Sequence, residues 1–226
     1  MANQGEQGTE DIREAARKAV ERGADITQQM HDITLQALTE GEIKPERVRE
    51  VTRSVFEGVR EAAPAQPEQL RKIWGETVEG IDQALRKAAE ASNLAMQEAA
   101  GRLHDFSEND LKRAMDDMAQ LEDMFLDTVK QFAANTSEVN REILDDLVAH
   151  SRRSGTAVGQ QTAEALEKLR VQFEQAGTES MKAGVAAART AGASIAQMAA
   201  GMLAGIADAM APGAGEKTDE KGDEKD

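Results

Sequence analysis

Apolar positions recur along this chain at intervals of three and four residues, the spacing that one face of an α-helix produces. The clearest example runs from Ile12 to Ala37, in steps that alternate between four and three residues. Such a heptad seam is typical of helices that pack against each other, within one chain or between chains. Its defining positions are Ile12, Ala19, Ile26, Met30 and Ile33.

Glycine and proline divide this helical pattern into segments. Residues 1–8 are polar and are expected to be disordered, with Thr9 as the N-cap of the first helix. Gly41 is the expected end of that helix, and Pro45 lies in the first turn of the next. Residues 9–62 are therefore predicted to form an N-terminal helical hairpin, and residues 63–67, which hold two prolines, form a hinge.

A bundle of long helices is predicted over residues 68–182. One helix is expected over 68–103, a second over 111–153 with an irregularity at 135–137, and a third from 158 onward. The seam of the second helix includes Met118 and Val139 and leaves Met124 outside. Gly155 is expected to break the chain between the last two helices.

Nothing in the pattern predicts a series of strands, so the expected fold class is all-α. We predict an elongated antiparallel bundle of long, coiled-coil-like helices with disordered termini. The composition agrees, with 31% charged and only 3% aromatic residues. Because aromatic side chains usually supply much of a globular core, we expect thin helix–helix seams instead of a thick core.

Residues 183–211 differ in character from the rest and are predicted to form an apolar helix rich in Ala, Gly and Met. No side chain between Arg189 and Asp208 is charged. Ser, Thr, Gln and Gly make this stretch too polar for a transmembrane span. Residues 212–226 are predicted to be a disordered charged tail, because they contain little that could bury a core.

Two interpretations of the uncharged stretch remain open. Gly201 and Gly205 permit close packing of a helix against a neighbour, which favours a buried or oligomerising helix. A narrow apolar stripe favours adsorption onto a hydrophobic surface or contact with a partner. The stripe consists of Ile195, Met198, Met202 and Ile206.

Charge and cysteine content narrow the classes of partner. The net charge is −15, which disfavours binding to nucleic acid or to an anionic membrane. The chain has no cysteine, which excludes disulfide and thiolate chemistry. The first residues lack a basic and an apolar segment of the secretory type, so we expect a cytoplasmic protein.

No motif for catalysis or metal binding is present. His31, His104 and His150 lie on separate segments, and none has an acidic residue three positions before it, as a di-iron bundle requires. Residues 155–159 lack the Gly-Lys-Ser/Thr of a phosphate-binding loop. We therefore expect no enzymatic activity, no cofactor and no metal. The basic residues are expected to form ordinary ion pairs, in clusters that comprise Arg13, Arg17, Lys18 and Arg22, and Arg152 and Arg153.

Over residues 68–210 the chain resembles the phasins, bacterial proteins that coat polyhydroxyalkanoate storage granules. The resemblance lies in alanine-rich amphipathic helices, the Gly/Ala/Met-rich apolar segment and the charged tail. It departs in that residues 216–226 are acidic, so the nucleoid binding of some phasins is not implied. Residues 80–92, and onward to 122, are also similar to an uncharacterised all-helical bacterial family, which implies the fold and no activity.

These observations predict a non-catalytic interaction protein of phasin-like type. Its amphipathic helices would coat a hydrophobic granule or lipid surface, and a homo-oligomer is expected. The alternative is a soluble oligomeric helical scaffold that assembles through the heptad seam and the Gly201/Gly205 face.

Overall fold

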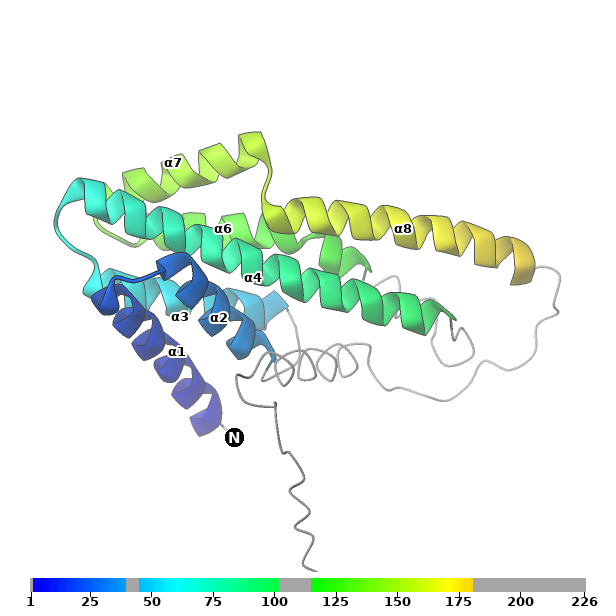
Figure 1. Ribbon diagram of the computed structural model, residues 1–226, viewed down its shortest axis with the longest axis horizontal. Helices are drawn as coiled ribbons and strands as arrows, with labels where there is room; N and C mark the ends of the chain where they lie inside the picture. Colours follow the sequence, from blue (N-terminus) through cyan, green and yellow to red (C-terminus); the bar gives the residue numbers. More distant parts are fainter. Residues whose placement is uncertain (1, 40–44, 102–114, 181–226) are drawn as a thin grey trace, which may run out of the picture.

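The structure, a computed structural model, describes residues 2–39, 45–101 and 115–180. These residues form helices and short turns with no strand among them, which confirms the predicted all-α helical bundle. The helices are α1 (Ala2–Arg22), α2 (Ile26–Thr39), α3 (Pro45–Ala62), α4 (Pro67–Gly101), α6 (Leu121–Ala134), α7 (Glu138–Ser154) and α8 (Ala157–Ser180), as labelled in Figure 1.

The first four helices form two pairs, and the hairpin of α6 and α7 packs against them. α1 packs along α3, and α2 packs along α4. α6 lies against α3, and α7 turns back over α6 (Figure 1). We call α1 to α7 the body. α8 runs beside α4 and reaches, together with the end of α4, well beyond the other helices (Figure 1).

Local sequence explains where several helices begin. α3 and α4 start at Pro45 and Pro67, and each proline is followed by a glutamate in the first turn. A first-turn proline lacks only an N–H that would have no helical partner, and an acidic side chain there complements the helix dipole. α1 begins at Ala2, so the N-cap predicted at Thr9 is wrong. The segment before Thr9 holds no proline, and its glycines, Gly5 and Gly8, lie within the helix.

The continuous heptad helix predicted from Ile12 to Ala37 is also wrong, because the chain bends between α1 and α2. Gly23 and Asp25 both have positive φ, at 68° and 44°. The Gly23 N–H closes α1 on the Ala19 carbonyl, and Oδ1 of Asp25 accepts the Gln28 N–H at 3.3 Å to begin α2. The apolar spacing runs on through this bend, so spacing alone does not reveal it.

The helix predicted over residues 111–153 is interrupted twice in its described part, at Gln120 and at residues 135–137. Ser137 has an extended backbone and serves as the N-cap of α7, so the irregularity expected at 135–137 is a reversal of the chain. The reversal changes which side chains are buried. Met124, placed outside the seam by its spacing, is 7% exposed, whereas Val139, placed within it, is 46% exposed.

The centre of the body is an aromatic cluster formed by Phe56 of α3, Trp74 of α4 and Phe132 of α6. The ring centroids lie 5.2 to 5.8 Å apart. The Trp74 indole N–H donates to Oδ1 of Asn140 at 3.0 Å, which ties α4 to α7. The few aromatic residues are therefore concentrated where four helices meet, and the body has a thicker core than the low aromatic content predicted.

Two glycines set the closest helix–helix contacts. A Cβ on Gly58 of α3 would overlap the Arg13 carbonyl oxygen of α1, and a Cβ on Gly80 of α4 would overlap the Thr27 carbonyl oxygen of α2. Each glycine follows a glutamate and lies thirteen residues after the proline that begins its helix. The α1–α3 and α2–α4 pairs thus repeat one packing arrangement.

Candidate functional site

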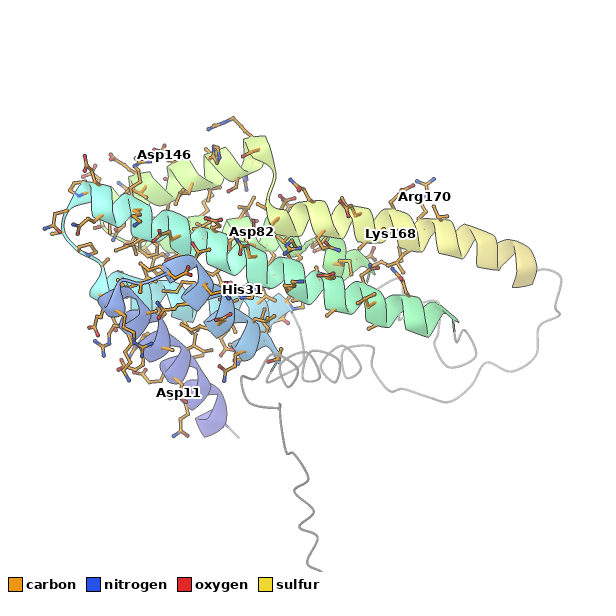
Figure 2. All side chains as sticks on the ribbon, in the orientation of Figure 1. Asp11, His31, Asp82, Asp146, Lys168 and Arg170 are labelled. Atoms are coloured by element: carbon orange, nitrogen blue, oxygen red, sulfur yellow. The ribbon has the colours of Figure 1, made fainter. Side chains whose placement is uncertain are left out.

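The most elaborate polar arrangement in the described residues is the junction at which α8 begins. The backbone N–H groups of Ala157 and Val158 donate to Oδ2 and Oδ1 of Asp82, at 2.7 and 2.9 Å. Asp82 lies in the middle of α4, at the point where α4 passes the start of α8 (Figure 2). A side chain distant in the sequence therefore caps α8.

A second carboxylate, Glu122 of α6, holds the residue before α8. Its Oε1 accepts the Thr156 N–H at 3.2 Å and the Thr156 hydroxyl at 2.7 Å. The Thr156 hydroxyl oxygen in turn accepts the Gly159 N–H at 2.9 Å. The N–H groups that a helix start leaves without a helical partner are thus all bonded here to side chains.

Burial of the Asp82 carboxyl raises its pKa above the usual range, and the charge of nearby Glu122 acts in the same direction. The two backbone donors and the guanidinium of Arg86 act in the opposite direction. The positive end of the α8 dipole also faces both carboxylates. The junction therefore brings two like charges together and holds them by hydrogen bonds to one helix terminus.

What this junction does chemically is to orient α8. Four of its hydrogen bonds come from the first residues of α8 and the preceding Thr156, and they end on two other helices. Gly155, with φ of 78°, makes the turn from α7. We call Asp82, Glu122 and Thr156 the latch.

Sequence reasoning did not single out Asp82 or Glu122, because each resembles any other acid on an amphipathic helix. A signal for a distant cap was nevertheless present. The first turn of α8 contains no acidic residue, and the position three after Thr156 is a glycine where a capping box has Glu or Gln. A helix start without an acid of its own can be capped by a carboxylate from elsewhere.

The residues predicted to contact a hydrophobic surface or partner lie outside the described part of the chain. This holds for the stripe of Ile195, Met198, Met202 and Ile206 and for the close-packing pair Gly201 and Gly205. The predicted apolar helix over 183–211 and the charged tail over 212–226 lie outside it as well.

The defining residues of the heptad seam lie inside the chain's own core. Ile12, Ala19, Ile26 and Met30 are each less than 9% exposed, and Ile33 is partly buried against the same core. They contact α3 and α4 of the same chain through the α1–α3 and α2–α4 pairings. In this arrangement the seam is no surface for a second copy.

The histidines are separated in the structure. His31 is buried beside Asp32, with 2.9 Å between Nδ1 and Oδ1, and His150 is exposed on α7. His104 lies outside the described residues. Within residues 2–39, 45–101 and 115–180, no three His, Cys, Asp or Glu side chains are grouped so that they could hold a metal ion.

Four residues of the basic clusters, Arg13, Arg17, Lys18 and Arg152, are paired with acids, as expected. Arg17 and Lys18 both contact the Glu14 carboxylate, at 2.7 and 3.2 Å, and they lower its pKa to about 2. Arg13 pairs with Glu10 in the same helix and lies 3.6 Å from Glu61 of α3. Arg152 reaches Asp127 of α6 at 3.2 Å. These exposed pairs contribute little stability and leave no strong basic patch among them.

The stretch that the sequence predicts to be too polar for a membrane span, within residues 183–211, lies outside the described residues. None of the described helices is both long enough and apolar enough to cross a bilayer. The acidic and basic side chains spread over all of them in Figure 2 give the physical reason.

Fold and junction together define an all-α helical bundle with one long helix held at its start by two carboxylates. The chain belongs to a family of unknown function, DUF6781, whose sequence model matches residues 2–212. The comparison with curated proteins found no match, and neither did the comparison with solved structures. The match agrees with the resemblance to an uncharacterised helical family, and it gives no support to the phasin resemblance.

Proposed function

We propose that the protein is a non-catalytic interaction protein that adsorbs to a hydrophobic granule or lipid surface in the manner of a phasin. The folded body serves as the water-facing part, and the uncharged stretch 190–207 makes the contact. Ile195, Met198, Met202 and Ile206 are the contact residues of this proposal.

One observation carries the proposal, namely how apolar residues are distributed along the chain. Among the side chains that the structure describes, the large apolar ones that are exposed are Leu94, Val139 and Val171, and they lie on separate helices. Scattered single residues of this kind are ordinary on soluble surfaces. The uncharged stretch begins ten residues after the end of α8, the helix that reaches farthest from the body (Figure 1).

The alternative, an oligomeric scaffold, was predicted to assemble through two surfaces, the heptad seam and the Gly201/Gly205 face. Because the heptad seam is covered by α3 and α4, a scaffold would depend on Gly201 and Gly205 alone. Light scattering of the full chain separates the two functions, since adsorption requires no defined oligomer.

The test is a flotation experiment with two probes, triolein droplets coated with phosphatidylcholine and particles of amorphous poly(3-hydroxybutyrate). The full chain is expected to float with at least one probe. Deletion of residues 183–211 should abolish flotation and leave most of the far-UV circular dichroism signal, because the described helices end at Ser180.

Point variants make the test local. The double variant Ile195→Asp with Met202→Asp should lose flotation, because two charges in a narrow apolar stripe oppose its burial. The matched control, Leu94→Asp with Val171→Asp, makes the same change at exposed positions of α4 and α8 and should float normally. Equal flotation of the full chain and the deletion variant would rule out the proposed contact.

A further inference from the structure

α8 is attached to the body differently from every other described helix. The main cluster of buried apolar side chains draws on α1, α2, α3, α4, α6 and α7, but from α8 it includes Val158 alone. As far as Val171, where the description of its side chains ends, the residues of α8 that are buried beyond the first turn are Thr162, Ala165 and Leu169, two of which are small or polar. Buried apolar area per residue is therefore low along this part of α8, and so is the stabilisation that this area provides.

The buried residues of α4 that follow the main core cluster, as far as Ala95, are likewise small or polar. They are Ala91, Asn93 and Ala95. Alanine and asparagine bury little apolar surface, so the contact between α4 and α8 is long but weak per residue. Segments with few buried apolar contacts open separately from a core and at lower free energy.

The polar latch supplies the attachment that the weak contact between α4 and α8 lacks. Asp82 and Glu122 accept from Thr156, Ala157 and Val158, and hydrogen bonds to charged acceptors are the stronger ones. All of these bonds lie at one end of α8, next to Gly155, whose positive φ makes it the natural pivot. If the latch opens, the rest of α8 has little to hold it.

We propose that α8 is a strap, which swings away from α4 about Gly155 as one unit while α1 to α7 remain folded. When the protein meets a hydrophobic surface, opening of the strap frees the seam of α8 for contact with that surface. This second step rests on the proposed function, whereas separate opening of α8 in solution does not.

Hydrogen–deuterium exchange on the full chain tests the strap in solution. Peptides from residues 157–171 should exchange faster than peptides from residues 51–59 and 74–85, which contain the core of α3 and α4. Exchange of all these segments at one common rate would overturn the proposal, because α8 would then open only with global unfolding.

Two latch variants sharpen the test. Glu122→Gln removes the charged acceptor of Thr156. Gly159→Ala adds a Cβ that would overlap the Glu122 carboxylate and so displaces it, while it also makes α8 a better helix former. Both should speed exchange of α8 about tenfold, the effect of losing about 1.4 kcal/mol of attachment, and leave the core peptides unchanged.

Gly159→Ala separates the latch from simple helix stability, because improved helix propensity alone would slow exchange in α8. Asp123→Asn is the matched control, since Asp123 is an exposed acid in the same turn of α6 as Glu122 and should leave exchange unchanged. Slower exchange of α8 in Gly159→Ala would show that the latch does not govern opening.

Spin-label distances test the step at the surface and do not depend on latch variants. The chain has no cysteine, so Lys87→Cys on α4 with Lys168→Cys on α8 gives a uniquely labelled pair, and Arg53→Cys with Gln69→Cys gives a control pair within the body. On triolein–phosphatidylcholine droplets the first distance should lengthen and the second should not. Flotation with both distances unchanged would refute opening at the surface. If the full chain does not float, the proposed function fails, and exchange alone decides whether α8 is a strap.

Discussion

Two glycines of one helix allow a prediction in which the same substitution has opposite effects on stability. Gly75 and Gly80 both lie within α4. A Cβ on Gly75 would meet nothing within 4 Å, whereas a Cβ on Gly80 would lie 2.9 Å from the Cβ of Met30 and 3.0 Å from the backbone nitrogen of His31. The change to alanine is therefore chemically the same and sterically different.

The magnitudes follow from helix propensity and from packing. Alanine is favoured over glycine in a helix by about 1 kcal/mol, so Gly75→Ala should raise the free energy of unfolding by about that amount. At Gly80 the added methyl group meets atoms of α2 well inside the usual carbon–carbon separation of about 3.5–4.0 Å. A backbone carbonyl, here that of Thr27, cannot rotate away, so α2 and α4 must separate.

Overpacking of this kind costs about 1–3 kcal/mol, which exceeds the gain in propensity. Gly80→Ala should therefore lower the free energy of unfolding, and because both variants gain the same propensity, they should differ by the overpacking cost of about 1–3 kcal/mol. Gly58→Ala should act like Gly80→Ala, because its Cβ would lie 3.0 Å from the Cβ of Ala16.

Urea unfolding followed by the single tryptophan, Trp74, reports on the body and is the assay of choice. Thermal melts by circular dichroism provide the second probe. If Gly80→Ala stabilises the protein as much as Gly75→Ala does, the close approach of α2 and α4 is wrong, and with it the repeated pairing of α1–α3 and α2–α4.

Two further predictions concern buried polar groups. Thr52→Val should stabilise the protein by about 1 kcal/mol, since the Thr52 hydroxyl is buried without a hydrogen-bond partner among the described residues. Thr128→Val is the control, because it removes a 2.7 Å hydrogen bond to the Met124 carbonyl. It should give no gain in stability in the same urea titration. Because folding raises the pKa of Asp82, its contribution to stability is greatest below the unfolded value of 3.8 and declines as pH rises through the folded value. Stability differences between the wild type and Asp82→Asn, measured from about pH 3 to pH 7, should show that decline and then level off, and an opposite slope would contradict the raised pKa.

The sequence predicts helices well here because their signals are local. The prolines at 45 and 67, the glycine at 155 and the spacing of apolar side chains each act within a few residues, and helix bounds in the structure follow them closely. The spacing of apolar residues does not reveal a break where a turn leaves the intervals between apolar positions unchanged. Between α1 and α2 the apolar residues keep their intervals through Gly23 and Asp25, although the two helices pack on different partners.

The latch could not be predicted from the sequence for a different reason. Asp82 and Glu122 receive their role from the N-terminus of α8, which lies 75 residues from Asp82 and 34 residues from Glu122 along the chain. Nothing in the sequence near either acid distinguishes it from neighbours that face water, such as Asp123. A pairing over such separations is set by the tertiary arrangement, and only the missing acid in the first turn of α8 hints at it.

The body and α8 are held in place by two different kinds of contact. In the body, Phe56, Trp74 and Phe132 join three helices through large apolar contacts, which resist opening because every helix would lose them together. In α8, as far as Val171, the buried apolar side chains are Val158, Ala165 and Leu169, and the hydrogen bonds to carboxylates lie at its start. Water replaces hydrogen bonds far more readily than it replaces buried aromatic contacts. A surface that favours burial of apolar residues would therefore bind α8 and the sequence after it before it unfolds the body.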